Sequence, residues 1–318
     1  MTPMVSAPAP GATGSSVLGS LARVVVSPYL LLVYAMVFWA GNAIVGRAVN
    51  QEIPAITLSF WRWTIAFALL LPFNFRQIRL RWPVILRHWR LLLLYALLGL
   101  VGCNVLTYSA LHYTTAVNSS LINSATPIFV MCLSFLLFGD RIQPRQMIGV
   151  LVSLLGVVAI VSGGQLGSLG AFAVNRGDFM MLAGIGLWSA YTALLRRKPE
   201  GLPPMAFLSV LMGMGALIEL PFYLIERALG GAIEPSAGNL LAILYVAIFP
   251  AVIALHFWNR AVAALGANRV SPFIHLLPVF GTVLAVIFLG ERFGAHHALG
   301  IALIFFGVYL ASRRRRAA

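Results

Sequence analysis

The amino-acid sequence predicts an all-α integral membrane protein whose ten transmembrane helices form two inverted five-helix repeats. The first supporting observation is composition, since 60% of the 318 residues are hydrophobic and only 9% are charged. A soluble domain of ordinary composition is far less apolar and carries more charge. The second observation is an internal repeat, and the third is the placement of the basic residues.

Two parts of the sequence match without a gap when one is displaced by 151 residues. Each copy contains two apolar segments joined by a short charged turn, so a pair of membrane helices has been duplicated. The first helix of each half matches with a displacement of 149 residues. Because an odd number of spans separates the copies, the second half should lie inverted in the membrane, as in alternating-access proteins. The matched pairs include Trp39 and Trp188, Arg47 and Arg196, Ala110 and Ala261, Ser120 and Ser271, Pro127 and Pro278, Gly149 and Gly300, and Gly156 and Gly307.

The expected helices each approach the length of about 20 residues that crosses a bilayer. Residues 1–27 are expected to be a disordered cytoplasmic tail, because they are rich in Ala, Pro, Gly and Ser. Residues 28–163 should form the first five-helix repeat, 177–312 the second, inverted repeat, and 313–318 a basic cytoplasmic C-terminus. The expected spans are residues 29–47, 56–73, 91–111, 117–138 and 148–162, followed by 179–195, 205–225, 240–264, 270–289 and 299–311.

The basic residues predict which connections lie on the cytoplasmic side. Seventeen of the 22 Lys and Arg share one side of the membrane if the N-terminus is cytoplasmic. This bias obeys the positive-inside rule, places both termini in the cytoplasm and explains the net charge of +14 without a nucleic-acid partner. The seventeen are Arg23, Arg76, Arg79, Arg81, Arg87, Arg90, Arg141, Arg145, Arg196, Arg197, Lys198, Arg260, Arg269 and Arg313 to Arg316.

Motifs for catalysis and for cofactors are missing from the sequence. It contains no Walker A loop, no HExxH and no GxSxG. Cys103 and Cys132 both lie in apolar runs and are interpreted as buried small residues, which excludes a disulfide framework or a metal-binding CxxC pair. We therefore expect no cofactor and no enzymatic activity. Without an ATP site, any transport would have to be driven by a gradient.

A doubled set of short motifs resembles the EamA family of the drug/metabolite transporter superfamily. The resemblance covers residues 29–312 and is closest to the YddG-type exporters of aromatic and other neutral amino acids. It implies ten helices in two inverted halves around a central cavity, a bacterial inner-membrane location and export of small metabolites. One departure is Asp140, where the family usually has Glu. The motifs are Phe60-Trp61-Arg62, Tyr108-Ser109-Ala110-Leu111, Ala116, Ala125-Thr126-Pro127 and Gly139-Asp140-Arg141, with second copies at Trp258 to Ala261, Ala267, Pro278 and Gly290-Glu291-Arg292.

Polar residues on the fourth and ninth expected spans follow helical spacing. Ser120, Ser124 and Pro127 fall at i, i+4 and i+7 and so share one stripe of a helix. Their repeat partners are Ser271, His275 and Pro278. Polar side chains are costly in lipid, so these stripes should face protein or water. The two prolines each remove a backbone donor, and we expect them to bend the helices as conformational hinges.

Aromatic and amide side chains on four other spans complete the candidate substrate-binding set. Indole and phenol faces could stack on a large side chain, while polar groups hold an ammonium and a carboxylate. The hypothesis is a zwitterionic substrate. Helix packing by small polar residues and interfacial placement of Trp and Tyr are the alternative explanations. The additional candidates are Trp39, Asn42, Asn104, Tyr108, Trp188, Tyr191, His256 and Trp258.

Two charged residues inside expected spans allow two interpretations each. Arg62 could extend outward to the membrane surface, or it could be a fixed positive charge that attracts a substrate carboxylate. Glu219 could be a proton-coupling acid, or a residue stabilised by a neighbour near the outer end of its helix. Proton antiport, exchange and facilitated transport therefore all stay open.

The sequence thus predicts a secondary transporter that exports small amphiphilic metabolites, chiefly aromatic and other neutral amino acids, by alternating access. One alternative is export of cationic or lipophilic drugs, in which aromatic residues would act through cation–π contacts. A second alternative is a polytopic membrane enzyme, although no cluster of carboxylates or metal ligands is recognisable. The expected partners are a small-molecule substrate and the lipid bilayer. Nothing in the sequence requires a second subunit, so a monomer is expected.

Overall fold

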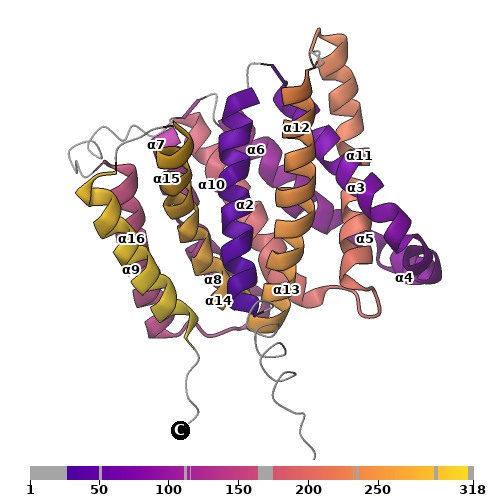
Figure 1. Cartoon of the computed structure of the whole chain (residues 1–318). Helices are drawn as coiled ribbons and strands as arrows, with labels where there is room; N and C mark the ends of the chain where they lie inside the picture. The colour runs from indigo at the N-terminus through magenta and orange to yellow at the C-terminus, as the bar shows by residue number, and fades with distance from the viewer. Residues whose placement is uncertain are drawn as a thin grey trace, which may run out of the picture.

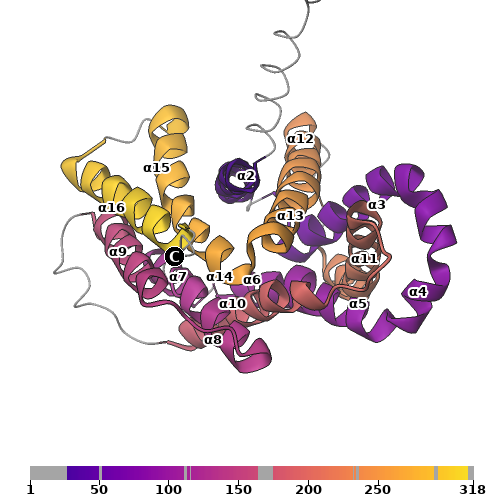
Figure 2. The ribbon, with the colours of Figure 1, turned by 90° about the horizontal axis from the view of Figure 1, so that it is seen from below.

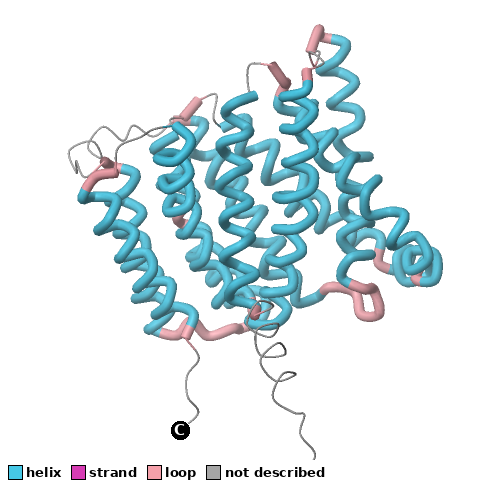
Figure 3. The backbone as a smooth tube through the Cα atoms, viewed as in Figure 1, coloured by secondary structure: helices cyan, strands magenta, loops and turns pink. Residues whose placement is uncertain are grey.

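The protein is an all-helical bundle in the part of the chain that the structure describes (Figures 1 and 3). Nine described segments are long and apolar enough to cross a membrane, and four of these segments consist of consecutive helical elements. The tenth expected span is present as consecutive shorter helical pieces. The structure is a computed structural model that describes residues 27–49, 52–110, 113–114, 116–163, 175–231, 233, 236–289 and 293–313. The predicted N-terminal tail and basic C-terminus lie almost entirely outside these residues.

The helices of the two halves follow the chain in the same order. The first half contains α2 (Pro28–Val49), α3 (Ala55–Leu80), α4 (Trp82–Arg87), α5 (Trp89–Tyr95), the π-helix η1 (Ala96–Gly102), α6 (Cys103–Ala110), α7 (Ala116–Asn123), α8 (Thr126–Phe138) and α9 (Pro144–Val161). The second contains α10 (Arg176–Leu194), the 3₁₀ turn η3 (Leu195–Arg197), α11 (Pro204–Ala228), α12 (Ala237–Val246), the π-helix η4 (Ala247–Ala254), α13 (Leu255–Leu265), α14 (Ala267–Val270), the 3₁₀ turn η5 (Ser271–His275), α15 (Leu276–Leu289) and α16 (Ala295–Ser312).

The internal repeat found in the sequence is present in the backbone, including its irregularities. The π-helices η1 and η4 begin 151 residues apart, as do the regular helices α9 and α16. The fourth and ninth spans are both interrupted near their middle. Since π-helices are rare, their recurrence in one register shows that the two halves share a detailed framework.

The first helix of each half packs chiefly against the other half. α2 contacts η4, α13 and α15, whereas α10 contacts η1, α6 and α8. Figure 2 shows α2 end-on, between α15 on one side and α12 with α13 on the other. Each half therefore completes its packing with a helix that belongs to the other half.

The described ends of the chain lie at the same end of the bundle. The hydroxyl of Tyr29, at the start of α2, donates to the carbonyl of Ser312, at the end of α16, at 3.4 Å. The Arg145 side chain, at the start of α9, donates to the carbonyl of Arg313. The start of α2 and the end of α16 therefore lie side by side in the described part of the chain.

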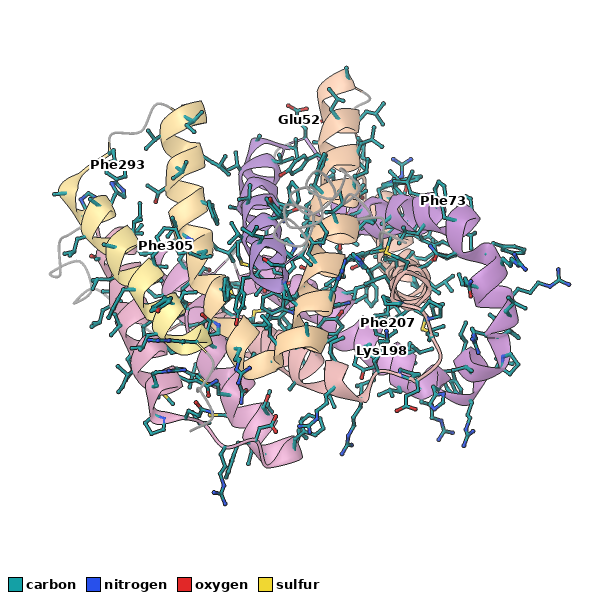
Figure 4. All side chains as sticks on the ribbon, turned by 60° about the horizontal axis from the view of Figure 1, so that its bottom comes forward. Glu52, Phe73, Lys198, Phe207, Phe293 and Phe305 are labelled. Carbon is teal, nitrogen blue, oxygen red and sulfur yellow. The ribbon has the colours of Figure 1, made fainter. Side chains whose placement is uncertain are left out.

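Basic side chains gather at this same end. Arg196, after α10, pairs with Asp140, between α8 and α9, at 2.9 Å. Because α10 ends where α2 begins, the first helices of the two halves run in opposite directions, as an inverted repeat requires. Lys198 lies nearby with its ammonium 5.5 Å from the centre of the Phe207 ring (Figure 4). Partial burial lowers the pKa of Lys198 below its ordinary value.

The helices α9 and α16 form a closely packed pair at one edge of the molecule (Figure 2). Glycines allow this approach, because a Cβ atom at Gly156 would lie only 2.6 Å from the carbonyl oxygen of Gly300. Gly149 and Gly307 face each other in the same way. Small residues of this kind let helix backbones approach in membranes.

Two expectations about single segments are wrong. The second span does not end at residue 73, because α3 continues to Leu80 and leaves Phe73 85% exposed (Figure 4). The helix continues because Pro72 lacks only one backbone donor and the residues after it have no glycine to end the helix. Cys132 is exposed on α8 instead of buried, since its side chain points away from the neighbouring helices.

Candidate functional site

Three tryptophans from both halves meet at the centre of the helix arrangement. Trp39 on α2, Trp188 on α10 and Trp258 on α13 form a triangle. The ring centroids are 5.5 Å apart for Trp39 and Trp188, 5.4 Å for Trp39 and Trp258, and 5.7 Å for Trp188 and Trp258. Trp258 is fully buried, while Trp39 and Trp188 keep part of their surface exposed. We call these three residues the indole triangle.

Two tyrosines extend the aromatic surface from the indole triangle toward α5. The ring of Tyr191 stacks on Trp188 with a centroid distance of 5.3 Å, and Tyr95 meets Tyr191 edge-on at 6.0 Å. The Tyr191 hydroxyl donates to Oδ1 of Asn259 at 2.9 Å. Tyr95 and Asn259 were missed by the sequence reasoning, although Asn259 directly follows Trp258 in an apolar span. A single amide in such a span was the available signal.

The indole triangle together with Tyr95 and Tyr191 is called the aromatic cluster, and the π-helical segments position its rings. Trp39 donates from its indole nitrogen to the carbonyl of Pro250, inside η4, at 3.2 Å. The repeat partner of Pro250 is Gly99 in η1, and the ring of Tyr191 packs directly against it. A Cβ atom at Gly99 would lie within 2.8 Å of the Tyr191 ring, so only glycine fits this contact. π-helical turns frequently mark functional sites.

Unpaired donors lie beside the indole triangle. The indole nitrogen of Trp258 and the amide nitrogen of Asn259 are both buried and have no hydrogen-bond partner in the described part of the chain. An unpaired buried donor costs about 1–3 kcal/mol. Two such donors next to exposed aromatic faces are suited to an acceptor group on a bound molecule.

A second cluster joins the interrupted fourth and ninth spans. His275 is 1% exposed and uses both ring nitrogens, with Nδ1 2.6 Å from the Ser153 hydroxyl and Nε2 2.8 Å from the carbonyl of Ser124. Since Ser124 is the repeat partner of His275, matched positions of the two halves bond directly to each other. In this conformation the imidazole has no nitrogen available for a ligand.

The fourth and ninth spans are broken helices, which corrects the expectation of two continuous helices with kinks. Pro127 lies in the first turn of α8, immediately after a turn at residues 124–125, and the Thr126 hydroxyl donates to the carbonyl of Asn123 at 2.6 Å. Pro278 lies in the first turn of α15, after the 3₁₀ turn η5. Proline is tolerated in a first helical turn because its missing donor is not needed there. The prolines therefore follow the breaks instead of bending intact helices.

The remaining predicted residues are not joined to the indole triangle. Asn104 donates to the carbonyl of Leu100 on its own helix at 2.5 Å, and the His256 ring lies 6.2 Å from Phe257. Asn42 and Ser120 are half-buried, and Ser271 is buried with its hydroxyl unpaired among the described residues. The side chain of Tyr108 lies outside the described part of the structure. The structure thus brings together Trp39, Trp188, Tyr191 and Trp258 in one cluster and Ser124 with His275 in another.

Surface pockets lie away from the indole triangle. One of about 480 Å³ is lined by residues from Ile233 to Ile243, and another of about 330 Å³ by residues that include Ile56 and Leu229. Both are at the edge of the bundle where α11 ends and α12 begins. Neither is lined by a residue of the aromatic cluster.

The apolar helices in the described part of the chain are those of a multi-pass membrane protein, and the family match shows that its class is that of the transporters, not of the enzymes. Residues 26–162 and 175–313 each match the EamA-like transporter family, and the chain belongs to this family. An uncharacterized transporter of Archaeoglobus fulgidus is 30% identical over 90% of this chain and 98% of its own length. A probable amino-acid metabolite efflux pump of Salmonella typhimurium is 25% identical over 88% of this chain and 93% of its own. A solved crystal structure, 22% identical, superimposes with a TM-score of 0.74 over 90% of this chain and 96% of that chain.

Proposed function

We propose that this transporter exports small amphiphilic metabolites, chiefly aromatic and other neutral amino acids, across the bacterial inner membrane by alternating access. The observation that carries the proposal is the indole triangle, because both repeats contribute to it. A substrate held there would contact both halves at once. Its passage would then follow from their relative movement.

The chemistry of the cluster fits a zwitterion with a large side chain. The partly exposed faces of Trp39 and Trp188 can stack on an apolar or aromatic group and attract an ammonium through cation–π contact. The unpaired donors of Trp258 and Asn259 can receive a carboxylate. Similarity to the Salmonella efflux pump supports this class of substrate.

The other predicted site residues would take part after a conformational change. Asn42, Asn104, Ser120, Ser271 and His256 are not joined to the triangle in the present state. The breaks before Pro127 and Pro278 provide positions where half-helices can tilt, with the Ser124–His275 contact opening and closing. The side with the basic residues would be cytoplasmic by the positive-inside rule.

Counterflow of labelled phenylalanine into proteoliposomes loaded with unlabelled phenylalanine tests the proposal. We expect uptake above that of protein-free liposomes, and a loss of at least about tenfold in Trp188→Ala, which equals about 1.4 kcal/mol. The exposed Phe305 of α16 (Figure 4) provides the matched control, since Phe305→Ala removes an aromatic ring outside the cluster. Its uptake should equal that of the wild type.

Two outcomes would contradict the proposed substrate class. One is the absence of counterflow for phenylalanine, tryptophan and leucine in correctly folded protein. The other is strong competition by tetraphenylphosphonium, which would favour export of lipophilic cations instead. Equal uptake by Trp188→Ala and the wild type would place the substrate elsewhere in the bundle.

A further inference from the structure

A buried acid and a buried base lie together at the α3–α11 interface, outside the aromatic cluster. Glu219 on α11 is 1% exposed and Arg62 on α3 is 8% exposed. Arg62 therefore does not extend outward to the membrane surface, which was one expectation from the sequence. Glu219 lies inside α11 and faces α3.

Neither side chain has a full set of partners. Ser59 donates to Oε1 of Glu219 at 2.9 Å, but Oε2 has no partner in the described residues. The guanidinium of Arg62 lies over the Trp63 ring, 4.3 Å from its centroid, and its Nε is also unpaired. Arg62 is close enough to attract the carboxylate electrostatically, yet the two form no ion pair among the described residues.

Two other groups face this acid. The indole of Trp63 lies beside the carboxylate, although its N–H completes no hydrogen bond of ordinary geometry. Cys103, at the start of α6, is close enough to interact electrostatically with both Glu219 and Arg62. The groups around Glu219 are therefore one donor, one separated cation, one indole and one thiol.

Two opposing effects act on the protonation of Glu219, because burial favours the neutral acid and the nearby Arg62 favours the carboxylate. Removing a carboxylate from water is costly unless cations and donors contact it, and a single hydroxyl provides little compensation. The separated guanidinium attracts the anion more strongly the closer it lies. A small displacement of α3 relative to α11, or entry of water, would therefore change which form is favoured.

The pair is not part of the framework that the two halves share. With the displacement of 149 residues that aligns the first helices, Arg62 corresponds to Leu211 and Glu219 to Leu70. Both leucines are buried in the same hydrophobic cluster as Trp63. Leucine therefore packs at the equivalent positions of the other half, so packing alone does not require charged residues here.

A short path connects the acid to the aromatic cluster. The thiol of Cys103 donates to the carbonyl of Gly99 in η1 at 3.1 Å, and the ring of Tyr191 packs on Gly99. We propose that Glu219 is the proton-binding site of this transporter, taking up one proton on Oε2 and releasing it to water as α3 and α11 move. This proposal rests on the proposed transport function, because it names the ion that the substrate movement is coupled to.

Infrared difference spectroscopy on the purified protein tests proton binding without any substrate. The carbonyl stretch of a buried protonated carboxylic acid should be present at acidic pH, disappear as pH rises, and be lost in Glu219→Gln. Glu226 is the matched control on the same helix, because its Oε2 accepts from the Thr57 amide at 2.7 Å and the Thr57 hydroxyl at 2.6 Å. The band should be retained in Glu226→Gln.

A second variant keeps the test decisive if Glu219→Gln does not fold. Ser59→Ala removes the one donor to the carboxylate and leaves the acid in place. The neutral form is then favoured, so the band should persist to higher pH than in the wild type. An unchanged titration in Ser59→Ala, or an unchanged band in folded Glu219→Gln, would overturn the assignment.

Transport measurements then separate coupling from substrate choice. The ratio of phenylalanine flux with a pH gradient to flux without one should exceed unity in the wild type and in Glu226→Gln, and fall to unity in Glu219→Gln. A ratio above unity in Glu219→Gln would overturn the coupling role. Absence of phenylalanine flux in the wild type would instead count against the proposed substrate class, while the infrared result still decides the proton site.

Discussion

The two repeats share a backbone but differ in the side chains at the centre. The π-helices, the broken spans and the glycines through which α9 and α16 approach each other recur in one register. Trp39 and Trp188 are the same residue at matched positions, as are Ser120 with Ser271 and Pro127 with Pro278, but other central pairs differ. The partners of Asn42, Thr107, Ser124, Arg62 and Leu70 are Tyr191, Trp258, His275, Leu211 and Glu219.

This difference separates two roles within one duplicated structure. Under the proposed mechanism of alternating access, a shared backbone would let the two halves exchange equivalent conformations. Under the proposed function, unlike side chains at the centre would let a single site present different groups to the two ends of a zwitterion. The comparison predicts that substitutions in the shared framework have matching effects in both halves, and that substitutions at unlike positions do not.

The largest effect is expected in the shared framework. Gly156→Leu and its repeat counterpart Gly307→Leu should each destabilise the protein by about 3 kcal/mol, because the new side chain meets the neighbouring backbone. Gly186→Leu is the control, since no atom lies within 4 Å of a Cβ there. Unfolding by denaturing detergent measures the three changes. Unequal losses at the two matched glycines would break the proposed equivalence of the halves.

A smaller loss is expected when His275 is replaced by the residue at its repeat partner. His275→Ser removes the contacts with Ser153 and Ser124, and at about 1 kcal/mol for each hydrogen bond the loss should be about 2 kcal/mol. The same detergent unfolding measures it. His256→Ser is the control, because the half-buried His256 ring has no hydrogen bond among the described residues. It should lower the free energy of unfolding by much less than His275→Ser does. Similar losses of stability in both variants would show that the His275–Ser124 contact between the repeats contributes no more than an ordinary side chain.

Substrate affinity should change modestly when one hydroxyl is removed from the aromatic cluster. Tyr191→Phe keeps the ring but removes the bond to Asn259, which should weaken binding by about 1 kcal/mol, or roughly fivefold. The half-saturation concentration for phenylalanine counterflow measures this. Tyr245→Phe is the control, because that hydroxyl donates to the Phe38 carbonyl outside the cluster. An equal shift in both variants would show that Tyr191 acts only through general packing.

The smallest effect is expected at the exposed end of the bundle. Asp140→Asn removes the ion pair with Arg196, whose partners are 63% and 41% exposed. Water and salt screen such pairs, so the stability should fall by at most about 0.5 kcal/mol. Thermal unfolding at low and high salt measures the difference. A loss of several kcal/mol would show that this turn organises the inner end of both α8 and α10.

The sequence predicted the repeat, the helical membrane fold and the meeting of Trp39 with Trp188 and Trp258. The repeat could be recognised because a fixed displacement preserves spacing and, at positions such as Trp39 and Trp188, residue type. The helix breaks were not predicted, since Pro127 and Pro278 are compatible with either a kink or a new helix start. In the amino-acid sequence the π-helices are marked by little more than Pro250 and Gly99.

The candidate site could be predicted only in part, because the sequence does not contain the packing between helices. Periodicity places residues on one face of a helix but cannot give the rotation of that helix against its neighbours. Ser124 and His275 were therefore assigned to the same site as the tryptophans, whereas the structure joins them to each other. Asn259 was missed because the aromatic pattern ended at Trp258. The orientation of Arg62 toward α11 depends on helix packing, which no local pattern contains.

The exchange of first helices between the halves has a consequence for biosynthesis. α2 leaves the ribosome first, yet its packing partners η4, α13 and α15 belong to the last third of the chain. During membrane insertion α2 therefore stays in lipid without its packing partners until most of the protein has been synthesised. If the two halves were expressed separately, each would lack the helix that fills its interior. Neither half is therefore expected to be stable until the two associate, with α2 packed in the second half and α10 in the first.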